Sequence, residues 1–99
     1  MRDVIAGFDW DGGNREKCQK HGVSVAEIEF VLTSELRVTP DPAHSDEEER
    51  FIGIGRTAEG KAIFVAFTFR LKGDERLIRP ISARYMHKKE IQAYEKKRS

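Results

Sequence analysis

The sequence has very little cysteine and no long apolar run. Its 99 residues include one cysteine, which excludes an intramolecular disulfide, a C-x-x-C redox site and a zinc knuckle. The first residues lack the apolar stretch of a signal peptide, and no run reaches the ~18 apolar residues that a membrane-spanning helix needs. These absences exclude a disulfide-stapled secreted scaffold, and we expect a soluble, cytoplasmic protein.

An excess of one charge is also missing. Lys and Arg number 18 against 17 Asp and Glu, a net charge of +1, which excludes a supercharged nucleic-acid arm. The 38% of hydrophobic residues excludes a wholly disordered chain, and the length allows a single core, so we expect one domain over 1–99. The charges are separated, because 41–49 is acidic and 84–98 is mostly basic. This separation fits a surface that attracts a polyanion, and it also fits an ordinary solvated surface.

The N-terminal third predicts one strand and two helices. β-branched and aromatic residues over 4–10 favour a strand. Asp11 can cap a short polar helix over 14–21, which Gly22 then ends. Residues 24–27 form a capping box, so we expect a second helix whose apolar residues pack on a sheet.

The rest of the chain is typical of antiparallel strands. Composition and turn chemistry predict a hairpin of 50–56 and 61–70. Alternation places Arg70 on a face with small side chains, which leaves room for a ligand. Pro80 lacks an N–H group and therefore indicates a sheet edge or a bulge. The other expected elements are a strand over 36–39, a loop over 41–49, a turn over 72–75, a strand over 77–83, and a helix over 87–97 with Ile91 and Tyr94 docked on the sheet.

Candidate catalytic residues stand at the ends of the predicted elements. They are Lys20, His21, Arg50, Arg70 and Arg84. The arginines can stabilise negative charge that develops on phosphate, and either His21 or Lys20 can transfer protons, so this set can act on RNA without a metal. Each residue taken singly also fits a surface charge, or, for Lys20 and His21, a favourable position at a helix C-terminus.

A metal centre is the alternative to this chemistry. Cys18 and His21 lie on one helical face and His44 can approach from the loop, but the chain has neither a second Cys nor an H-x-x-x-H pair. The acidic cluster over 46–49 fits a divalent ion or a solvated loop. We expect no metal and no cofactor. Tyr85 is the best candidate among the aromatic residues for stacking on an unpaired base, because it follows a predicted site residue at a strand end.

Three motifs in order resemble the BrnT family. They are K-H-G-V-S over 20–24, H-S-x-x-E-E-R over 44–50, and I-S-A-R over 81–84. The resemblance covers nearly the whole chain, with departures at Pro80 and Tyr85. It implies a ribonuclease toxin of a type II toxin–antitoxin system with an α+β, RelE-like fold. The implied order is β-α-α-β-β-β(-β)-α, with an antiparallel sheet packed by two N-terminal helices and a C-terminal helix.

The resemblance also implies partners and site residues. A BrnA-type antitoxin would bind and block the chain in a hetero-oligomer, and operator DNA would be contacted only through that complex. The active-site set carried over is Lys20, His21, Arg50, Arg70 and Arg84. Further RNA contacts are expected from Glu49, Tyr85, Lys88 and Lys89.

The expected reaction is attack of a ribose 2′-OH on the adjacent phosphate, so that RNA is cut and DNA is not. The alternative is a non-enzymatic RelE-like module that binds an antitoxin or RNA. A DNA-binding repressor acting alone is disfavoured, because the net charge is only +1 and no helix-turn-helix pattern is found.

Overall fold

A five-stranded sheet with strand order β1-β5-β4-β3-β2 forms the centre of the molecule. The computed structural model describes residues 5–34, 36–44 and 48–98. Neighbouring strands are antiparallel except β1, which runs parallel to β5. The expected α+β class is therefore confirmed, whereas the expectation of a wholly antiparallel sheet is wrong. The elements are β1 (Gly7–Phe8), α1 (Gly12–Gln19), α2 (Val25–Leu32), β2 (Arg37–Pro40), a 3-10 turn (Pro42–His44), β3 (Phe51–Arg56), β4 (Ala62–Lys72), β5 (Glu75–Tyr85) and α3 (Lys88–Arg98).

Side-chain caps fix both N-terminal helices. The Asp11 carboxylate accepts from the Asn14 N–H at 2.9 Å, and the Asn14 side chain accepts from the Asp11 N–H at 2.7 Å. Ser24 and Glu27 exchange the equivalent bonds at the start of α2. Gly22, between the helices, has a φ of 93°, a left-handed conformation that glycine adopts without strain. The predicted caps and the glycine stop are confirmed.

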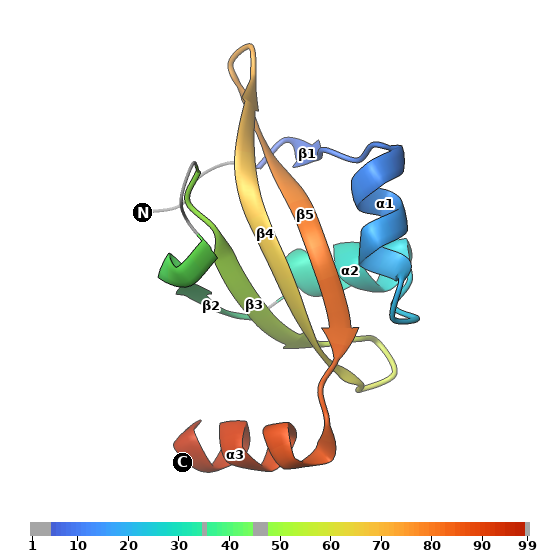
Figure 1. Cartoon of the computed structure of the whole chain (residues 1–99), viewed down its shortest axis with the longest axis vertical. Helices are drawn as coiled ribbons and strands as arrows, with labels where there is room; N and C mark the ends of the chain where they lie inside the picture. The colour runs from blue at the N-terminus through green and yellow to red at the C-terminus, as the bar shows by residue number, and fades with distance from the viewer. Residues whose placement is uncertain (1–4, 35, 45–47, 99) are drawn as a thin grey trace.

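Helix α1 lies along the outer edge of β5 (Figure 1). Strand β1 pairs with β5 only through Gly7 and Phe8, so it is shorter than predicted. Beyond it, the buried Asn14 amide donates to the Pro80 carbonyl at 2.8 Å and to the Asp9 carbonyl at 3.0 Å. The Asn14 side chain thus donates to the Pro80 carbonyl at a position where no strand pairs with the outer side of β5.

The hydrophobic core lies between the sheet and α2, which is behind the strands in Figure 1. Ile28 and Val31 of α2 and Ile63 and Val65 of β4 are all fully buried. Cys18 of α1 is also fully buried, as expected of a small apolar residue. The opposite side of the sheet carries the alternate residues of β4, Phe64, Ala66, Thr68 and Arg70, together with the side chains beside them, and we call it the open face.

Strand β5 contains a bulge next to Pro80. Phe67 of β4 pairs with Pro80, whereas the preceding residue, Ala66, pairs with Ser82, so Ile81 is an extra residue in β5. Pro80 is fully buried and lies beyond the short pairing with β1, where α1 covers the outer side of β5. Both interpretations of Pro80 apply: β5 has a bulge here, and no strand pairs with its outer side at this position.

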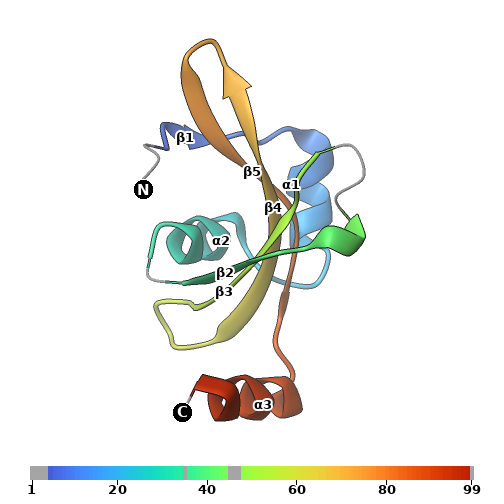
Figure 2. The ribbon, with the colours of Figure 1, turned by 90° about the vertical axis from the view of Figure 1, so that its left-hand side faces the viewer.

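Helix α3 lies beyond one end of the sheet (Figures 1 and 2). Glu95 pairs with Arg56 of β3 at 2.6 Å, and Glu90 pairs with Arg84 of β5. Ile91 and Tyr94 are half-buried and line a cavity between α3 and the outer strands. Both side chains thus lie on the side of α3 that is turned toward the sheet, with a cavity between the helix and the strands.

Candidate functional site

The open face carries a cavity of about 320 Å³, which we call the His21–Arg84 cavity. The end of α1 and the strands β3, β4 and β5 all contribute to it. Its lining residues are His21, Ile52, Phe64, Ala66, Ser82, Ala83 and Arg84. Ala66 is on the face of β4 where the alternation predicted room for a ligand, but Arg70, beside which that room was expected, does not line the cavity.

Two of the predicted site residues, His21 and Arg84, meet at this cavity. His21 is exposed and follows the last turn of α1, and Arg84 stands near the end of β5. The Arg84 guanidinium carbon lies 4.4 Å from the centroid of the Phe64 ring, a cation–π contact that keeps the cation at the mouth of the cavity. A proton-transferring group and a fixed cation thus face the same space from distant parts of the chain.

Glu90 of α3 holds Arg84 from the other side. Two parallel hydrogen bonds of 2.9 Å join the guanidinium to the carboxylate, and Glu90 also accepts from the His87 N–H at 2.8 Å. The bonds from Arg84 lower the pKa of Glu90 to about 2, and the same pair raises the pKa of Arg84. An anion that binds Arg84 must therefore share the guanidinium with Glu90 or displace it.

Arg70 lies on the open face but away from the cavity. Phe64, which is opposite Arg84 in the register, and Arg70 are separated by six residues of β4, a distance of roughly 20 Å along a strand. Arg70 donates to Glu48 from Nε at 3.2 Å and from Nη2 at 3.1 Å. Arg70 and Arg84 are therefore too far apart for both to contact a single phosphate group.

Arg50 lies between these two arginines. It immediately precedes β3 and is two residues before Ile52, so it projects from the same side of the sheet at the level of Thr68. The Thr68 hydroxyl donates to the Glu49 carbonyl at 2.6 Å. This bond holds the residues just before β3 against β4. The three arginines form a line on the open face rather than a cluster.

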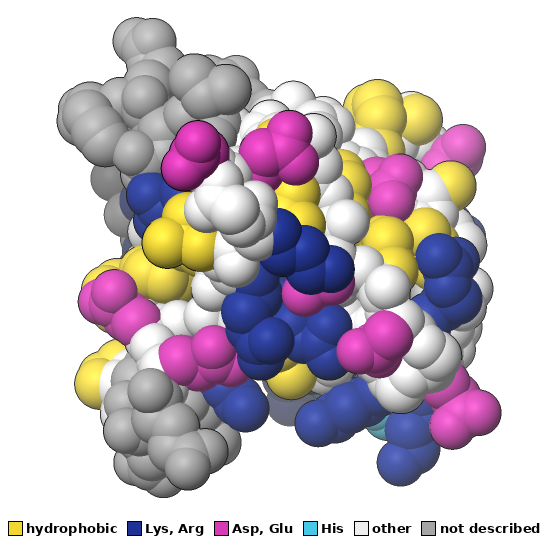
Figure 3. Space-filling model, turned by 90° about the horizontal axis from the view of Figure 1, so that it is seen from above, with side chains coloured by type: hydrophobic (Ala, Val, Ile, Leu, Met, Phe, Trp, Pro, Cys, Tyr) yellow, Lys and Arg dark blue, Asp and Glu magenta, His cyan; other side chains and the backbone are white. Residues whose placement is uncertain are grey.

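Arg79 belongs to the same face and was not among the predicted site residues. It pairs with Thr68 across the strands and contacts Asp11 at 2.8 Å and Asp9 at 3.4 Å. The hydrogen bond that Arg79 donates to the Asp11 carboxylate raises the pKa of Arg79. Lys72 also approaches Asp9, at 3.3 Å. Basic side chains with acidic ones among them are seen together at this end of the molecule in Figure 3.

The remaining predicted residues lie elsewhere. Lys20, Glu49, Lys88 and Lys89 are exposed and do not line the His21–Arg84 cavity. Tyr85 faces the helices, where its hydroxyl donates to Glu27 at 2.8 Å. This bond raises the pKa of Tyr85. The aromatic side chain at the cavity is Phe64, whose place follows from the alternation of β4.

The residues considered for a metal do not come together in the described part of the chain. Burial raises the pKa of the Cys18 thiol to about 11, which disfavours the thiolate form that binds metals. No group of three His, Cys, Asp or Glu side chains within 5–34, 36–44 and 48–98 is arranged to hold a metal ion. The His44 side chain, Asp46 and Glu47 lie outside the described residues. None of the helices described is long and apolar enough to cross a membrane.

Comparison with known proteins gives one family. A family model described as "Ribonuclease toxin, BrnT, of type II toxin-antitoxin system" matches residues 10–90, which include α1, α2, the whole sheet beyond β1 and the start of α3. No curated protein matches the chain closely enough to count as a relative. The matched range contains both His21 and Arg84, and it covers most of the chain. The chain therefore belongs to the BrnT family of ribonuclease toxins of type II toxin–antitoxin systems.

Proposed function

We propose that this toxin is a metal-independent endoribonuclease whose reaction takes place at the His21–Arg84 cavity. The observation that carries the proposal is the convergence of His21 and Arg84, from α1 and β5, on one cavity of the open face. The RelE-like topology that the family resemblance implied is also part of the proposal. It is supported by the observed order of one strand, two helices, four strands and a final helix.

In this mechanism the 2′-oxygen of a ribose attacks the adjacent phosphorus while its proton passes to a base. The bond from phosphorus to the 5′-oxygen breaks, and that oxygen takes up a proton. The products are a 2′,3′-cyclic phosphate and a 5′-hydroxyl. His21 transfers protons, and the Arg84 guanidinium, held over Phe64, stabilises the charge on the phosphate.

Arg50 and Arg70 bind the RNA backbone away from the reacting phosphate. Both belong to the open face, at increasing distance from Arg84 along β4. RNA lying along this line would place successive phosphates near successive cations. Lys20, Glu49, Lys88 and Lys89 are exposed residues that contact the flanking RNA in this proposal, and Phe64 replaces Tyr85 as the aromatic group nearest the reacting nucleotide.

The partner in this proposal is a BrnA-type antitoxin, which neutralises the toxin in a hetero-oligomer in the cytoplasm. Membership in a type II family supports an antitoxin partner. Cleavage of RNA by the free toxin would inhibit translation and growth. Operator DNA would be contacted through the complex with the antitoxin.

The test is an RNA cleavage assay with antitoxin-free protein in EDTA, with matched DNA as a second substrate. We expect cleavage of RNA alone. Arg84→Ala should lower the rate about 10²- to 10³-fold, because removal of one electrostatic donor to the reacting phosphate typically has that effect. His21→Ala should have a similar effect, whereas Arg70→Ala should mainly raise KM. Lys17→Ala, an exposed basic residue of α1, is the matched control and should leave the rate unchanged.

A second candidate function is a binding module without activity. It is favoured by the pairing of both Arg70 and Arg84 with carboxylates, Glu48 and Glu90 respectively. In that case the folded protein would cut no RNA in EDTA, with added Mg²⁺, or in a translating extract, yet would still bind the antitoxin.

A further inference from the structure

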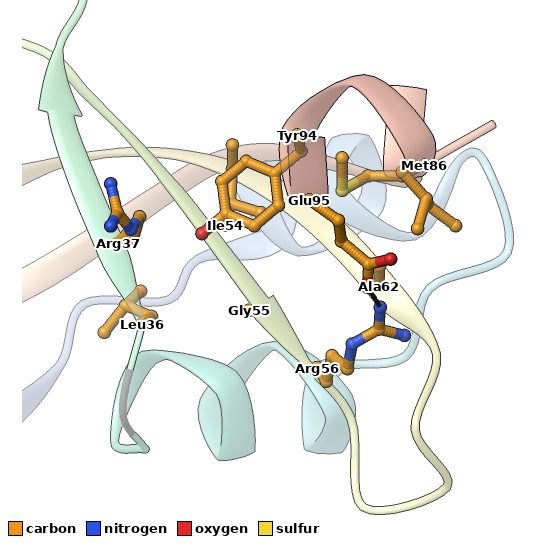
Figure 4. A pocket seen from close by; sticks show the side chains of 10 residues that line it. Leu36, Arg37, Ile54, Gly55, Arg56, Ala62, Met86, Tyr94 and Glu95 are labelled. Carbon is orange, nitrogen blue, oxygen red and sulfur yellow. Dashed lines mark hydrogen bonds and ion pairs between the residues drawn. The ribbon is translucent and has the colours of Figure 1, made fainter. Parts of the chain in front are cut away.

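A second cavity, of about 470 Å³, lies between α3 and the outer strands, and we call it the α3 groove. Figure 4 shows the Tyr94 ring projecting from α3 toward Ile54 of β3, with Arg37 on the far side and Arg56 near the end of β3. Met86, which links β5 to α3, also lines it. The groove is separate from the His21–Arg84 cavity, since the two share no lining residue.

The walls of the α3 groove combine apolar and aromatic side chains with charged ones. Leu36, Ile54, Ile91 and Tyr94 are only half-buried, although their side chains are apolar or aromatic. Apolar surface left partly exposed at a concave site gains free energy when another apolar side chain covers it. The groove therefore has the physical character of a binding site for a partner's apolar side chains.

The charge around the groove is predominantly positive. Arg37 and Arg56 line it against a single acidic lining residue, Glu95, which pairs with Arg56 at 2.6 Å. Helix α3, which forms one wall, is itself rich in lysine. Its exposed lysines include Lys88, Lys89, Lys96 and Lys97. A partner segment with carboxylates beside its apolar residues would match this pattern.

Strand β2 has few backbone groups with which an added strand of a partner could pair. It is the edge strand of the sheet and has only four residues. The Asp41 N–H donates inward to the Arg50 carbonyl, so in an antiparallel pair the backbone groups of Val38 and Pro40 point outward. Pro40 has no N–H to donate. The short edge therefore favours a partner held by its side chains in the groove over one held as an added strand.

We propose that the α3 groove binds an acidic, amphipathic segment of the antitoxin. Apolar side chains of that segment would fill the space between Ile54 and Tyr94, and its carboxylates would pair with Arg37 and Arg56. The inference rests on the antitoxin partner of the proposed function and is independent of the ribonuclease mechanism. It places antitoxin recognition outside the His21–Arg84 cavity.

The experiment measures binding of the antitoxin encoded beside the toxin by titration calorimetry with purified proteins. Arg37→Glu reverses a charge on the exposed rim, and Tyr94→Ala removes an apolar wall without touching the core. We expect each variant to weaken binding at least tenfold, and binding to weaken further as NaCl is raised from 50 to 500 mM. Both variants should keep the circular dichroism spectrum and the RNA cleavage rate of the unaltered toxin.

Two matched controls lie far from the groove. Arg15→Glu reverses a charge on α1, and Leu71→Ala removes an apolar side chain that is 74% exposed near the opposite end of β4. Neither should change antitoxin affinity by more than twofold. Unaltered affinity of both Arg37→Glu and Tyr94→Ala would overturn the proposal. Absence of RNA cleavage by every protein, with these affinity differences intact, would instead count against the ribonuclease mechanism alone.

Discussion

Arg84 and Glu90 are joined by two parallel hydrogen bonds of 2.9 Å across the turn between β5 and α3. The same carboxylate accepts from the backbone N–H of His87, the residue before α3. One acidic side chain therefore both fixes the cation at the His21–Arg84 cavity and caps the first turn of the C-terminal helix. In the proposed mechanism, RNA binding and the position of α3 would be linked through Glu90.

Glu90→Gln should strengthen RNA binding. Loss of the carboxylate removes a negative charge from beside the phosphate site, so the affinity for a polyanion should rise by a few-fold at low salt. The measurement is fluorescence anisotropy with a 2′-O-methyl oligonucleotide, which cannot be cleaved. Glu95→Gln is the control, because Glu95 is on the same helix and pairs with Arg56 instead. Equal affinities of the two variants would contradict the prediction.

The Arg84–Glu90 pair should also contribute to stability in a defined pH range. The pKa of Glu90 falls from 4.5 to about 2 on folding, so the contribution is complete above pH 4.5 and is lost as the pH falls toward 2. Urea unfolding at a series of pH values should show a difference between the unaltered toxin and Glu90→Gln that shrinks over this range. A difference independent of pH would show that the carboxylate charge is not its cause.

Asn14→Ala should destabilise the fold by about 2–3 kcal/mol, because it leaves the buried Pro80 carbonyl without its donor and removes the capping partner of Asp11. Gln19→Ala is the matched control on the same helix, since the Gln19 amide makes only an exposed bond to the Arg15 carbonyl. It should change the free energy of unfolding by less than about 0.5 kcal/mol. Denaturant titration of both variants tests the comparison.

Cys18 should resist alkylation in the folded protein. The side chain is fully buried, and burial raises the pKa of its thiol to about 11, so both access and thiolate formation are suppressed at pH 8. Iodoacetamide labelling followed by mass spectrometry should be slow in buffer and fast in 6 M guanidinium chloride. Similar rates in the two solvents would refute the burial of Cys18.

The features that could be predicted from sequence are those whose causes are local. The caps at Asp11 and Ser24 depend on side chains three residues apart, and the glycine stop depends on one residue. The bulge was expected because Pro80 cannot donate to a neighbouring strand. These elements lie within a few residues of where the sequence patterns predicted them.

The features that were missed depend on contacts between distant residues. Asn14 bonds to Pro80, 66 residues away, and this contact seats α1 along the edge of β5. The candidate site shows the same limit. The position of basic residues at element ends identified His21 and Arg84. No local pattern indicated that Arg70 is separated from Arg84 along β4, or that Arg84 forms an ion pair with Glu90.

The extra residue in β5 decides which arginines share a surface. Arg79 and Arg84 are five positions apart, an odd number that would send their side chains to opposite sides of a regular strand. Their partners in β4, Thr68 and Phe64, are four apart, and the bulge at Ile81 absorbs the difference. If the residues from Arg79 to Arg84 were all paired regularly, with no bulge, strict alternation would turn one of these cations into the core. The bulge in β5, as much as the composition of the strand, therefore determines the charge of the open face.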